Sequence, residues 1–181
     1  MPTFTQDWFT ESALRGAGSW RRWLVPRLAH LSDAQWLEIG SFEGRSALWT
    51  VENLLKGENS RLTCVDIWES ELESVFDANI AGITKIIKRK GCSKDVLPTL
   101  PLNYFHGAYI DGSHMQPDVH LDIRLTLPLL RLSGILVFDD YASDTPANCG
   151  VRPSVDRFLG EMGNRVEVLR SGYQVICQLR G

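Results

Sequence analysis

Leu37–Ala47 reads LEIGSFEGRSA, an apolar strand that runs into two glycines and then into a polar helix start. Strand–turn–helix units of this kind use glycine where the backbone must come close to a ligand. A dinucleotide-binding fingerprint would need glycine at position 42 and a small residue at position 45, but Phe42 and Arg45 stand there. A P-loop would need four residues between its glycines and then lysine, whereas three residues separate Gly40 from Gly44. The stretch therefore fits neither pattern.

An acidic residue follows the next predicted strand. Asp66 closes LTCVDIW, about two dozen residues beyond Gly40, where a ribose-binding acid lies in a doubly wound sheet. A ligand that carries a nucleoside but no phosphate would use such a carboxylate as an acceptor for its ribose hydroxyls, and Trp68 could form a wall beside its base. Taken singly, Gly40 and Gly44 could only shape a tight turn, and Asp66 could only cap a helix. Their order along the chain favours a nucleoside site.

Apolar strand-like runs alternate with helical segments along the whole chain. Such short, nearly continuous apolar strands indicate a parallel sheet covered on both faces by helices. We expect strands at Trp36–Ile39, Leu62–Ile67, Ile83–Ile87, Ala108–Ile110, Ile135–Phe138, Val166–Leu169 and Tyr173–Leu179. We expect helices at Trp20–Leu31 with Ser19 as N-cap, Arg45–Leu55, Ser93–Leu100, Pro117–Leu132 and Pro153–Met162. The last two strands are joined by Arg170-Ser171-Gly172 and predict an antiparallel hairpin.

Composition limits the kind of protein. A chain of 181 residues with 44% hydrophobic content can bury one good core, so we expect a single domain, 1–181, with an N-terminal extension and first helix over 1–33 and a Rossmann-like core over 34–181. A net charge of −3 argues against nucleic acid and anionic membrane as partners. The N-terminus lacks the pattern of a secretory signal, which favours a cytoplasmic protein. The four cysteines contain no CxxC pair and are expected to be reduced thiols.

The chain resembles class I S-adenosylmethionine-dependent methyltransferases. The phrases LEIGSFEGRSA, YIDGSH and GILVFDDY look most like small bacterial O-methyltransferases related to the sugar and catechol types. The resemblance implies a Rossmann-like, doubly wound, mostly parallel seven-stranded sheet with an antiparallel last strand. It also implies S-adenosylmethionine as cofactor. The cofactor-binding residues that it implies are Glu38, Gly40, Ser41, Gly44, Asp66, Ile67, Trp68, Cys92, Ser93 and Asp111.

Carboxylates dominate the expected acceptor side of the site. Asp111, Asp139 and Asp140 follow two adjacent predicted strands, and ligands bind outside such strand ends. Three oxygen donors brought together would repel one another unless a cation joined them, and Mg²⁺ prefers such ligands. In metal-dependent catechol- and sugar-type relatives the matching positions bind magnesium, so these residues are candidate metal ligands. The alternative is a solvated turn at Asp139-Asp140-Tyr141.

His114 is the candidate general base and Asp111 the second candidate catalytic residue. His114 follows Asp111 in DGSH, about where catechol-type relatives place the lysine that takes the acceptor's proton. Imidazole can do this work at neutral pH. The alternative is a turn residue that caps the following helix. Many relatives also carry aspartate where this chain has Cys92, and often where it has His106; a strand-end role is favoured for His106.

The expected function is methylation of a hydroxyl on a small molecule, with the loop from Tyr141 to Arg152 as part of the acceptor wall. A homodimer could complete that wall. The aromatic N-terminal residues Phe4, Trp8 and Phe9 could form a lid over the cofactor or only anchor the terminus. Two other classes stay open: a methyltransferase-like module that binds the cofactor without turnover, and a P-loop-like nucleotide hydrolase.

Overall fold

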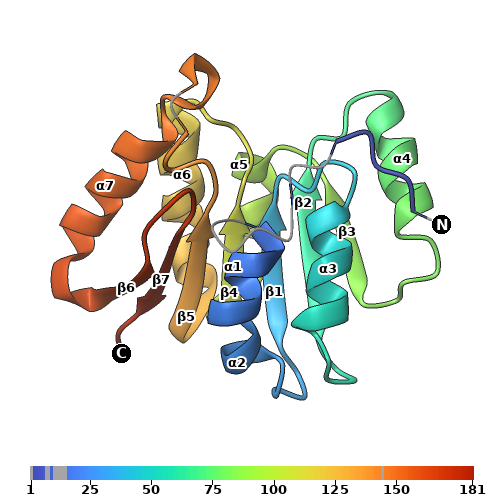
Figure 1. The fold of residues 1–181 in the computed structure, drawn as a ribbon, viewed down its shortest axis with the longest axis horizontal. Helices are drawn as coiled ribbons and strands as arrows, with labels where there is room; N and C mark the ends of the chain where they lie inside the picture. Colours follow the sequence, from blue (N-terminus) through green and yellow to red (C-terminus); the bar gives the residue numbers. More distant parts are fainter. Residues whose placement is uncertain (1, 7–8, 10–15, 144) are drawn as a thin grey trace.

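A computed structural model describes residues 2–6, 9, 16–143 and 145–181, and its centre is one seven-stranded sheet (Figure 1). The strand order is β3-β2-β1-β4-β5-β7-β6. Strands β1 to β5 pair in parallel, whereas β7 is antiparallel to both β5 and β6. The predicted doubly wound sheet with its antiparallel last strand is therefore confirmed. The strands are β1 Gln35–Ile39, β2 Arg61–Asp66, β3 Ile86–Lys90, β4 Phe105–Ile110, β5 Leu130–Phe138, β6 Val166–Arg170 and β7 Val175–Leu179.

Helices cover both faces of this sheet and alternate with the strands along the chain. One face carries α1 to α4, and the other carries α5, α6 and α7. The α-helices are α1 Gly16–Trp23, α2 Val25–Leu28, α3 Arg45–Asn53, α4 Glu71–Asn79, α5 Ser93–Val96, α6 Gln116–Thr126 and α7 Val151–Met162. Short 3₁₀ turns lie at η1 Leu97–Thr99, η2 Leu127–Leu129, η3 Pro146–Asn148 and η4 Gly163–Arg165.

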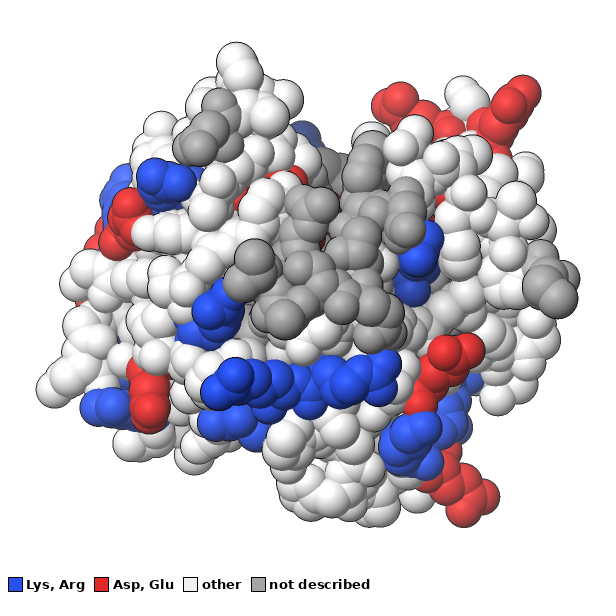
Figure 2. Space-filling model, in the orientation of Figure 1, with Lys and Arg blue, Asp and Glu red and all other residues white. Residues whose placement is uncertain are grey.

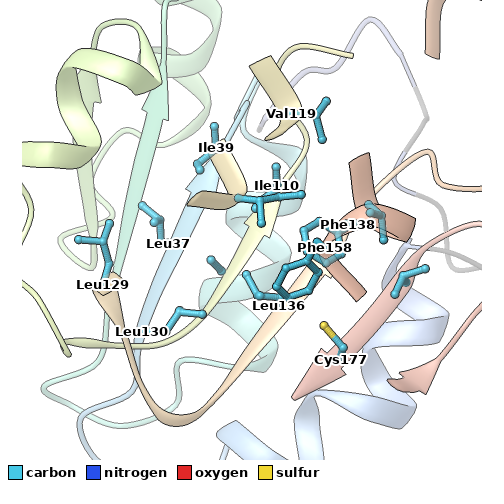
Figure 3. Close-up of a cluster of buried hydrophobic side chains, with 14 of the residues drawn as sticks. Leu37, Ile39, Ile110, Val119, Leu129, Leu130, Leu136, Phe138, Phe158 and Cys177 are labelled. Carbon is cyan, nitrogen blue, oxygen red and sulfur yellow. The ribbon is translucent and has the colours of Figure 1, made fainter. Parts of the chain in front are cut away.

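The alternation of side chains along each strand supplies two hydrophobic cores. On β1, Leu37 and Ile39 face the core beneath α5, α6 and α7, whereas Trp36 faces the core beneath α1 and α3. Figure 3 shows the first core, where Ile110 and Phe138 from neighbouring strands meet the helix side chains Val119 and Phe158. The second core is aromatic and contains Trp20, Trp36, Trp49, Trp68, Phe76 and Tyr109. Strands buried on both faces explain the continuous apolar runs of the sequence.

Several predicted boundaries were wrong, each for a local reason. The expected helix over 20–31 is split into α1 and α2 because Pro26 cannot donate a backbone hydrogen bond, and Ser19 lies inside α1 rather than capping it. The third strand begins at Ile86, three residues beyond the predicted start at Ile83. The fifth strand begins at Leu130, so the predicted helix over 117–132 ends earlier, and its last residues belong to η2 and β5. Helix α4 was not predicted.

Three further features concern the surface charge, the length and polarity of the helices, and the cysteines. On the face drawn in Figure 2, basic side chains form a row across the lower half, and acidic side chains lie beside them. Across the residues that the structure describes, every helix is too short or too polar to pass through a lipid bilayer. The four cysteines are free thiols; Cys64 and Cys177 are buried, and Cys92 and Cys149 are exposed.

Candidate active site

A cavity of about 770 Å³ opens at the carboxyl ends of the parallel strands. Ligands bind at this edge of an open α/β sheet because the loops there converge where the strand order reverses, and here β1 and β4 flank that point. Most of the predicted site residues line the cavity: Gly40, Ser41, Asp66, Ile67, Cys92, Ser93, Asp111, His114, Asp139 and Asp140. Glu38, Gly44 and Trp68 do not belong to its lining.

The turn after β1 is shaped by the backbone that faces it. Gly40 has φ +83°, and a Cβ atom placed on it would lie 1.9 Å from the backbone oxygen of Asp111. The sequence suggested that glycine is needed here for the approach of a ligand; in the structure, the approach of the chain after β4 already demands it. Gly44, with φ +84°, is the N-cap of α3 and abuts Phe76. Its role is to start the helix.

Asp66 ties three backbone N–H groups together at the cavity. Its Oδ2 accepts hydrogen bonds from the N–H of Ser41 at 2.8 Å and of Phe42 at 2.9 Å, while Oδ1 accepts one from Trp68 at 2.9 Å. The carboxylate thus holds the turn after β1 against the end of β2. Two carboxylate oxygens offer about four acceptor positions, so one position remains for a ligand hydroxyl.

Glu38 lies beneath this turn and is fully buried. Its Oε1 accepts a hydrogen bond from the Ser46 hydroxyl at 3.0 Å. Burial raises the pKa of Glu38 to about 8, although the hydroxyls of Ser41 and Ser46 lower it in part. The carboxyl group is therefore mostly protonated at neutral pH, and it supports the turn from below instead of lining the cavity.

The apolar wall at the end of β2 is formed by a different residue from the one expected. Trp68 is fully buried, packs on Phe76 with ring centroids 4.4 Å apart, and donates from Nε1 to the backbone oxygen of Phe42. Its ring cannot form the wall beside a base, so that expectation was wrong. Ile67 is 52% exposed and lines the cavity instead. Trp68 has φ +37° just after the end of β2, and its ring is directed into the core on the α4 side of the sheet.

An acidic group lies where β4 and β5 end. The Tyr109 hydroxyl lies 2.9 Å from Oδ2 of Asp111 and also within hydrogen-bond distance of Oδ2 of Asp139, and its single proton can be donated to only one of them at a time. Burial, followed by the charge of Asp139, raises the pKa of Asp111 to about 7, and burial also raises the pKa of Asp139. Oδ1 of Asp139 accepts from the backbone N–H of Asp140, so each oxygen of Asp139 has a partner within the protein.

His114 and Asp140 lie next to each other in the cavity lining. Nε2 of His114 lies 3.2 Å from Oδ2 of Asp140 and 3.7 Å from Oδ1 of Asp111. Ligand atoms of these three residues all lie within 4.8 Å of one another, a spacing that suits a metal ion. The neighbouring carboxylate of Asp111 is the main cause of a raised pKa at His114. In this arrangement His114, and not Asp139, completes the group with Asp111 and Asp140.

Some residues at the cavity were not predicted. Tyr173 donates a hydrogen bond to Asp140, and the buried Gln174 accepts one from Trp20 Nε1 at 3.0 Å. The buried Asp122 also lines the cavity. Tyr173 and Gln174 come from the β6–β7 hairpin, distant in sequence from the predicted motifs, whereas Asp122 lies on α6, which follows the DGSH motif directly. The one available signal was Asp122, the last residue of DGSHMQPDVHLD, which lies on the buried face of the helix that follows the DGSH motif.

The N-terminal segment reaches the same cavity. Thr5 donates from its backbone N–H and its hydroxyl to the buried carboxylate of Glu43, at 2.8 and 2.5 Å. Phe9 lines the cavity and packs edge-on against Trp20. The guanidinium of Arg45 lies 5.5 Å from the ring of Phe4. Trp8, the third aromatic residue of the expected lid, lies outside the described residues.

His106 lies at the start of β4, at the end of the strand opposite to Asp111. Its Nδ1 accepts the backbone N–H of Gln35 at 3.0 Å, and its Nε2 lies 3.1 Å from a nitrogen of Arg131. Burial and the charge of Arg131 lower its pKa. The favoured strand-end role of His106 agrees with this position.

Comparison with known proteins adds a family and a fold. Residues 37–141 match a family model described as a methyltransferase domain. Among solved structures, the chain is similar to the O-methyltransferase TomG from Streptomyces achromogenes, involved in tomaymycin synthesis and solved with SAM, at 22% identity and a TM-score of 0.70, over 93% of this chain and 82% of that one. Among curated proteins, none matches this chain.

Two further structures share the fold. An O-methyltransferase from Bacillus cereus in complex with SAH has 17% identity and a TM-score of 0.71, over 93% of this chain and 84% of that one. SAH-bound PaMTH1 from Podospora anserina has 16% identity and a TM-score of 0.69, over 96% and 82% of the two chains.

Proposed function

Because this chain belongs to the methyltransferase domain family, we propose that it transfers a methyl group from S-adenosylmethionine to a hydroxyl oxygen of a small molecule. The main support for the proposal is that two different sets of chemical groups line the same cavity. One set, at the ends of β1, β2 and β3, provides backbone groups and a carboxylate that can accept a hydrogen bond from a ribose hydroxyl. The other, at β4 and β5, offers carboxylates and an imidazole.

The first set suits the methyl donor. Asp66 retains one acceptor position for a ribose hydroxyl after its three backbone contacts. Ile67 supplies an exposed apolar surface for the base, and Ser93 a hydroxyl nearby. Gly40 and Ser41 lie between this region and Asp111, which is where the amino-acid end of the donor would extend. Solved relatives of this fold hold SAM or SAH, which supports the same cofactor here.

The second set suits a hydroxyl acceptor. His114 lines the cavity within reach of two carboxylates, and we assign it the removal of the acceptor's proton. The donor's sulfonium is already activated, so the protein has to align the hydroxyl oxygen with the methyl group and accept one proton. Asp111 lies between the donor and acceptor regions, where it orients His114.

As an alternative to proton removal by His114, the group of Asp111, His114 and Asp140 would hold a divalent cation, because an imidazole nitrogen that binds a cation cannot also accept a proton. Two carboxylates and one imidazole with ligand atoms within 4.8 Å of one another fit Mn²⁺ better than Mg²⁺, because Mg²⁺ prefers oxygen ligands and would rely on the two carboxylates and water. Asp139, which the sequence included, lies outside this group of three residues and contacts Tyr109 and the backbone N–H of Asp140. Bound Mg²⁺ would position the acceptor hydroxyl and make it more acidic.

The test combines binding with turnover. Calorimetry should detect binding of SAH, and methyl-labelled S-adenosylmethionine should label one or more members of a panel of phenols, catechols and sugars. His114→Ala should keep SAH affinity while turnover falls about 10²- to 10⁴-fold. His30→Ala, outside the cavity lining, is the matched control and should retain full turnover.

Two other results would change the proposal. Binding of SAH without labelling of any acceptor would favour a module that binds the cofactor without turnover. Binding of ATP in place of SAH would favour a nucleotide hydrolase. The three-residue spacing of the glycines and the buried Glu43 in that turn argue against the hydrolase.

A further inference from the structure

We propose that the carboxylate of Asp122 recognises the exocyclic amino group of the donor's adenine, and that it makes the site selective for adenine over 6-oxopurines. This inference rests on the proposed function, because it assigns a role within the same cofactor site. It concerns a residue on α6, outside the turns that carry the other site residues.

Asp122 is a buried acid that forms no salt bridge with the residues that the structure describes. It is 2% exposed, yet it lines the cavity. Among the described residues its polar neighbour is the hydroxyl of Ser93, whose hydrogen bond lowers its pKa in part. Burying a carboxylate without a cation is costly, and an apolar residue at this inner position of α6 would avoid that cost. A hydrogen-bond donor on a bound ligand would offset the cost of burying this carboxylate.

The position of Asp122 matches the base end of the cavity. The backbone N–H of Gly91 donates to the backbone oxygen of Asp66 at 2.9 Å. Ile67 therefore follows the end of β2 beside Cys92, which follows the end of the neighbouring β3. Ser93 follows and lies beside Asp122. On the other side, a Cβ atom placed on Gly112 would lie 3.5 Å from Oδ2 of Asp122. An apolar surface at Ile67 and an acceptor at Asp122 therefore bound the same region.

The chemistry of the two purine types is opposite at position 6. Adenine presents an amino group that donates hydrogen bonds, whereas a 6-oxopurine presents a carbonyl oxygen that accepts them. A carboxylate accepts from the first and repels the second. Burial raises the pKa of Asp122 to about 6, which leaves it mostly ionised at neutral pH. Sites that hydrogen-bond a ligand group reject analogues without it much more strongly than apolar pockets do.

The experiment compares SAH with S-inosylhomocysteine, the analogue with oxygen in place of the amino group, by calorimetry on the full chain. Wild type should bind SAH at least about 100-fold more tightly. Asp122→Asn, which keeps the shape and can also donate, should reduce this preference at least about tenfold. Asp95→Asn, an exposed acid on α5 outside the cavity lining, is the matched control and should keep the wild-type ratio.

The possible failures are distinguishable. If wild type binds neither compound, the proposed function fails. If wild type binds SAH but binds the analogue equally well, the role of Asp122 is refuted while the proposed function stands. An unchanged ratio in Asp122→Asn would refute it as well. Should that variant not fold, the wild-type ratio and the conservative Asp122→Glu decide, since displacing the carboxylate by one methylene should weaken SAH binding but retain rejection of the analogue.

Discussion

Nε2 of His114 lies 3.2 Å from Oδ2 of Asp140 and so joins the turn after β4 to the turn after β5. The two residues come from motifs that are separated in sequence by the whole of α6. Tyr173 donates to the other oxygen of Asp140 from the β6–β7 hairpin. The acceptor side of the cavity is thus assembled from three loops, and a change in any one of them should alter the other two.

The first prediction concerns the cation. Titration of the protein with Mn²⁺ or Mg²⁺ should show one site, and Asp140→Ala should lose most of the affinity because a hard cation needs its anionic oxygen ligands. Chelation should stop methyl transfer without a large change in SAH affinity. Asp33→Ala, an exposed acid before β1, serves as control. Full turnover in the presence of chelator would contradict a metal role.

A companion measurement separates the two ligand sets. If the cation uses Asp111, His114 and Asp140, Asp139→Asn should bind Mn²⁺ almost as well as wild type. If it uses the three aspartates that the sequence suggested, that variant should lose affinity as strongly as Asp140→Ala. Electron paramagnetic resonance of bound Mn²⁺ gives the readout without turnover.

The second prediction concerns two glycines that share a backbone conformation. Gly40 has φ +83° and Gly82 has φ +82°, but nothing lies within 4 Å of a Cβ placed on Gly82. Gly82→Ala should therefore lose about 1 kcal/mol of unfolding free energy from backbone strain alone. Gly40→Ala adds a collision with the backbone of Asp111 and should lose at least about 3 kcal/mol. Equal losses in chemical denaturation would show that the turn can move aside.

The strands and the turn after β1 could be predicted from the sequence, whereas contacts between distant segments could not. The approximate positions of the strands along the chain follow from apolar runs and turn residues, and the glycines mark the turn after β1 correctly. The reason for Gly40 is a contact with Asp111, which is remote in sequence, so no local pattern could supply it. Trp68 was misplaced for a similar reason: whether a large aromatic residue faces a cavity or a core depends on α4, which the sequence did not predict. Asp122 falls within the predicted helix over 117–132, but no motif in the sequence assigns it to the site.

The third prediction concerns Asp66. Asp66→Asn replaces one acceptor oxygen by a donor, so at least one of the N–H groups of Ser41, Phe42 and Trp68 loses its partner. The turn after β1 should loosen, and SAH affinity should fall about tenfold or more, as for hydrogen bonds to a charged group. Calorimetry with SAH and with its 2′-deoxy form separates the two roles. If Asp66 contacts the ribose directly, loss of the 2′-hydroxyl should weaken binding less in Asp66→Asn than in wild type.

Unchanged SAH affinity in Asp66→Asn would contradict both roles of this residue. An equal effect of the 2′-hydroxyl in wild type and variant would leave Asp66 as a support for the turn only. Asp95→Asn, exposed and outside the cavity lining, controls for the loss of one negative charge.

The last prediction concerns the dependence of stability on pH that Glu38 imposes. Its pKa is about 8 in the folded protein, against an ordinary value of 4.5. Between these values the folded protein keeps a proton that the unfolded chain has released. The free energy of unfolding should therefore fall as pH rises through this window, with a slope from this group of up to about 1.4 kcal/mol per pH unit, and level off above pH 8.

Glu38→Gln carries a neutral side chain at every pH and removes this contribution. Denaturation of wild type and variant at several pH values from about 5 to 9 should show the variant gaining stability relative to wild type as pH rises, with the difference constant above pH 8. Taking the difference cancels the other buried acids, Asp111, Asp122 and Asp139. Glu58→Gln, an exposed acid before β2, should give a flat difference. A flat difference for Glu38→Gln would mean that the carboxyl is ionised in the folded protein at neutral pH, and it would remove the neutral support that we assign to the turn after β1.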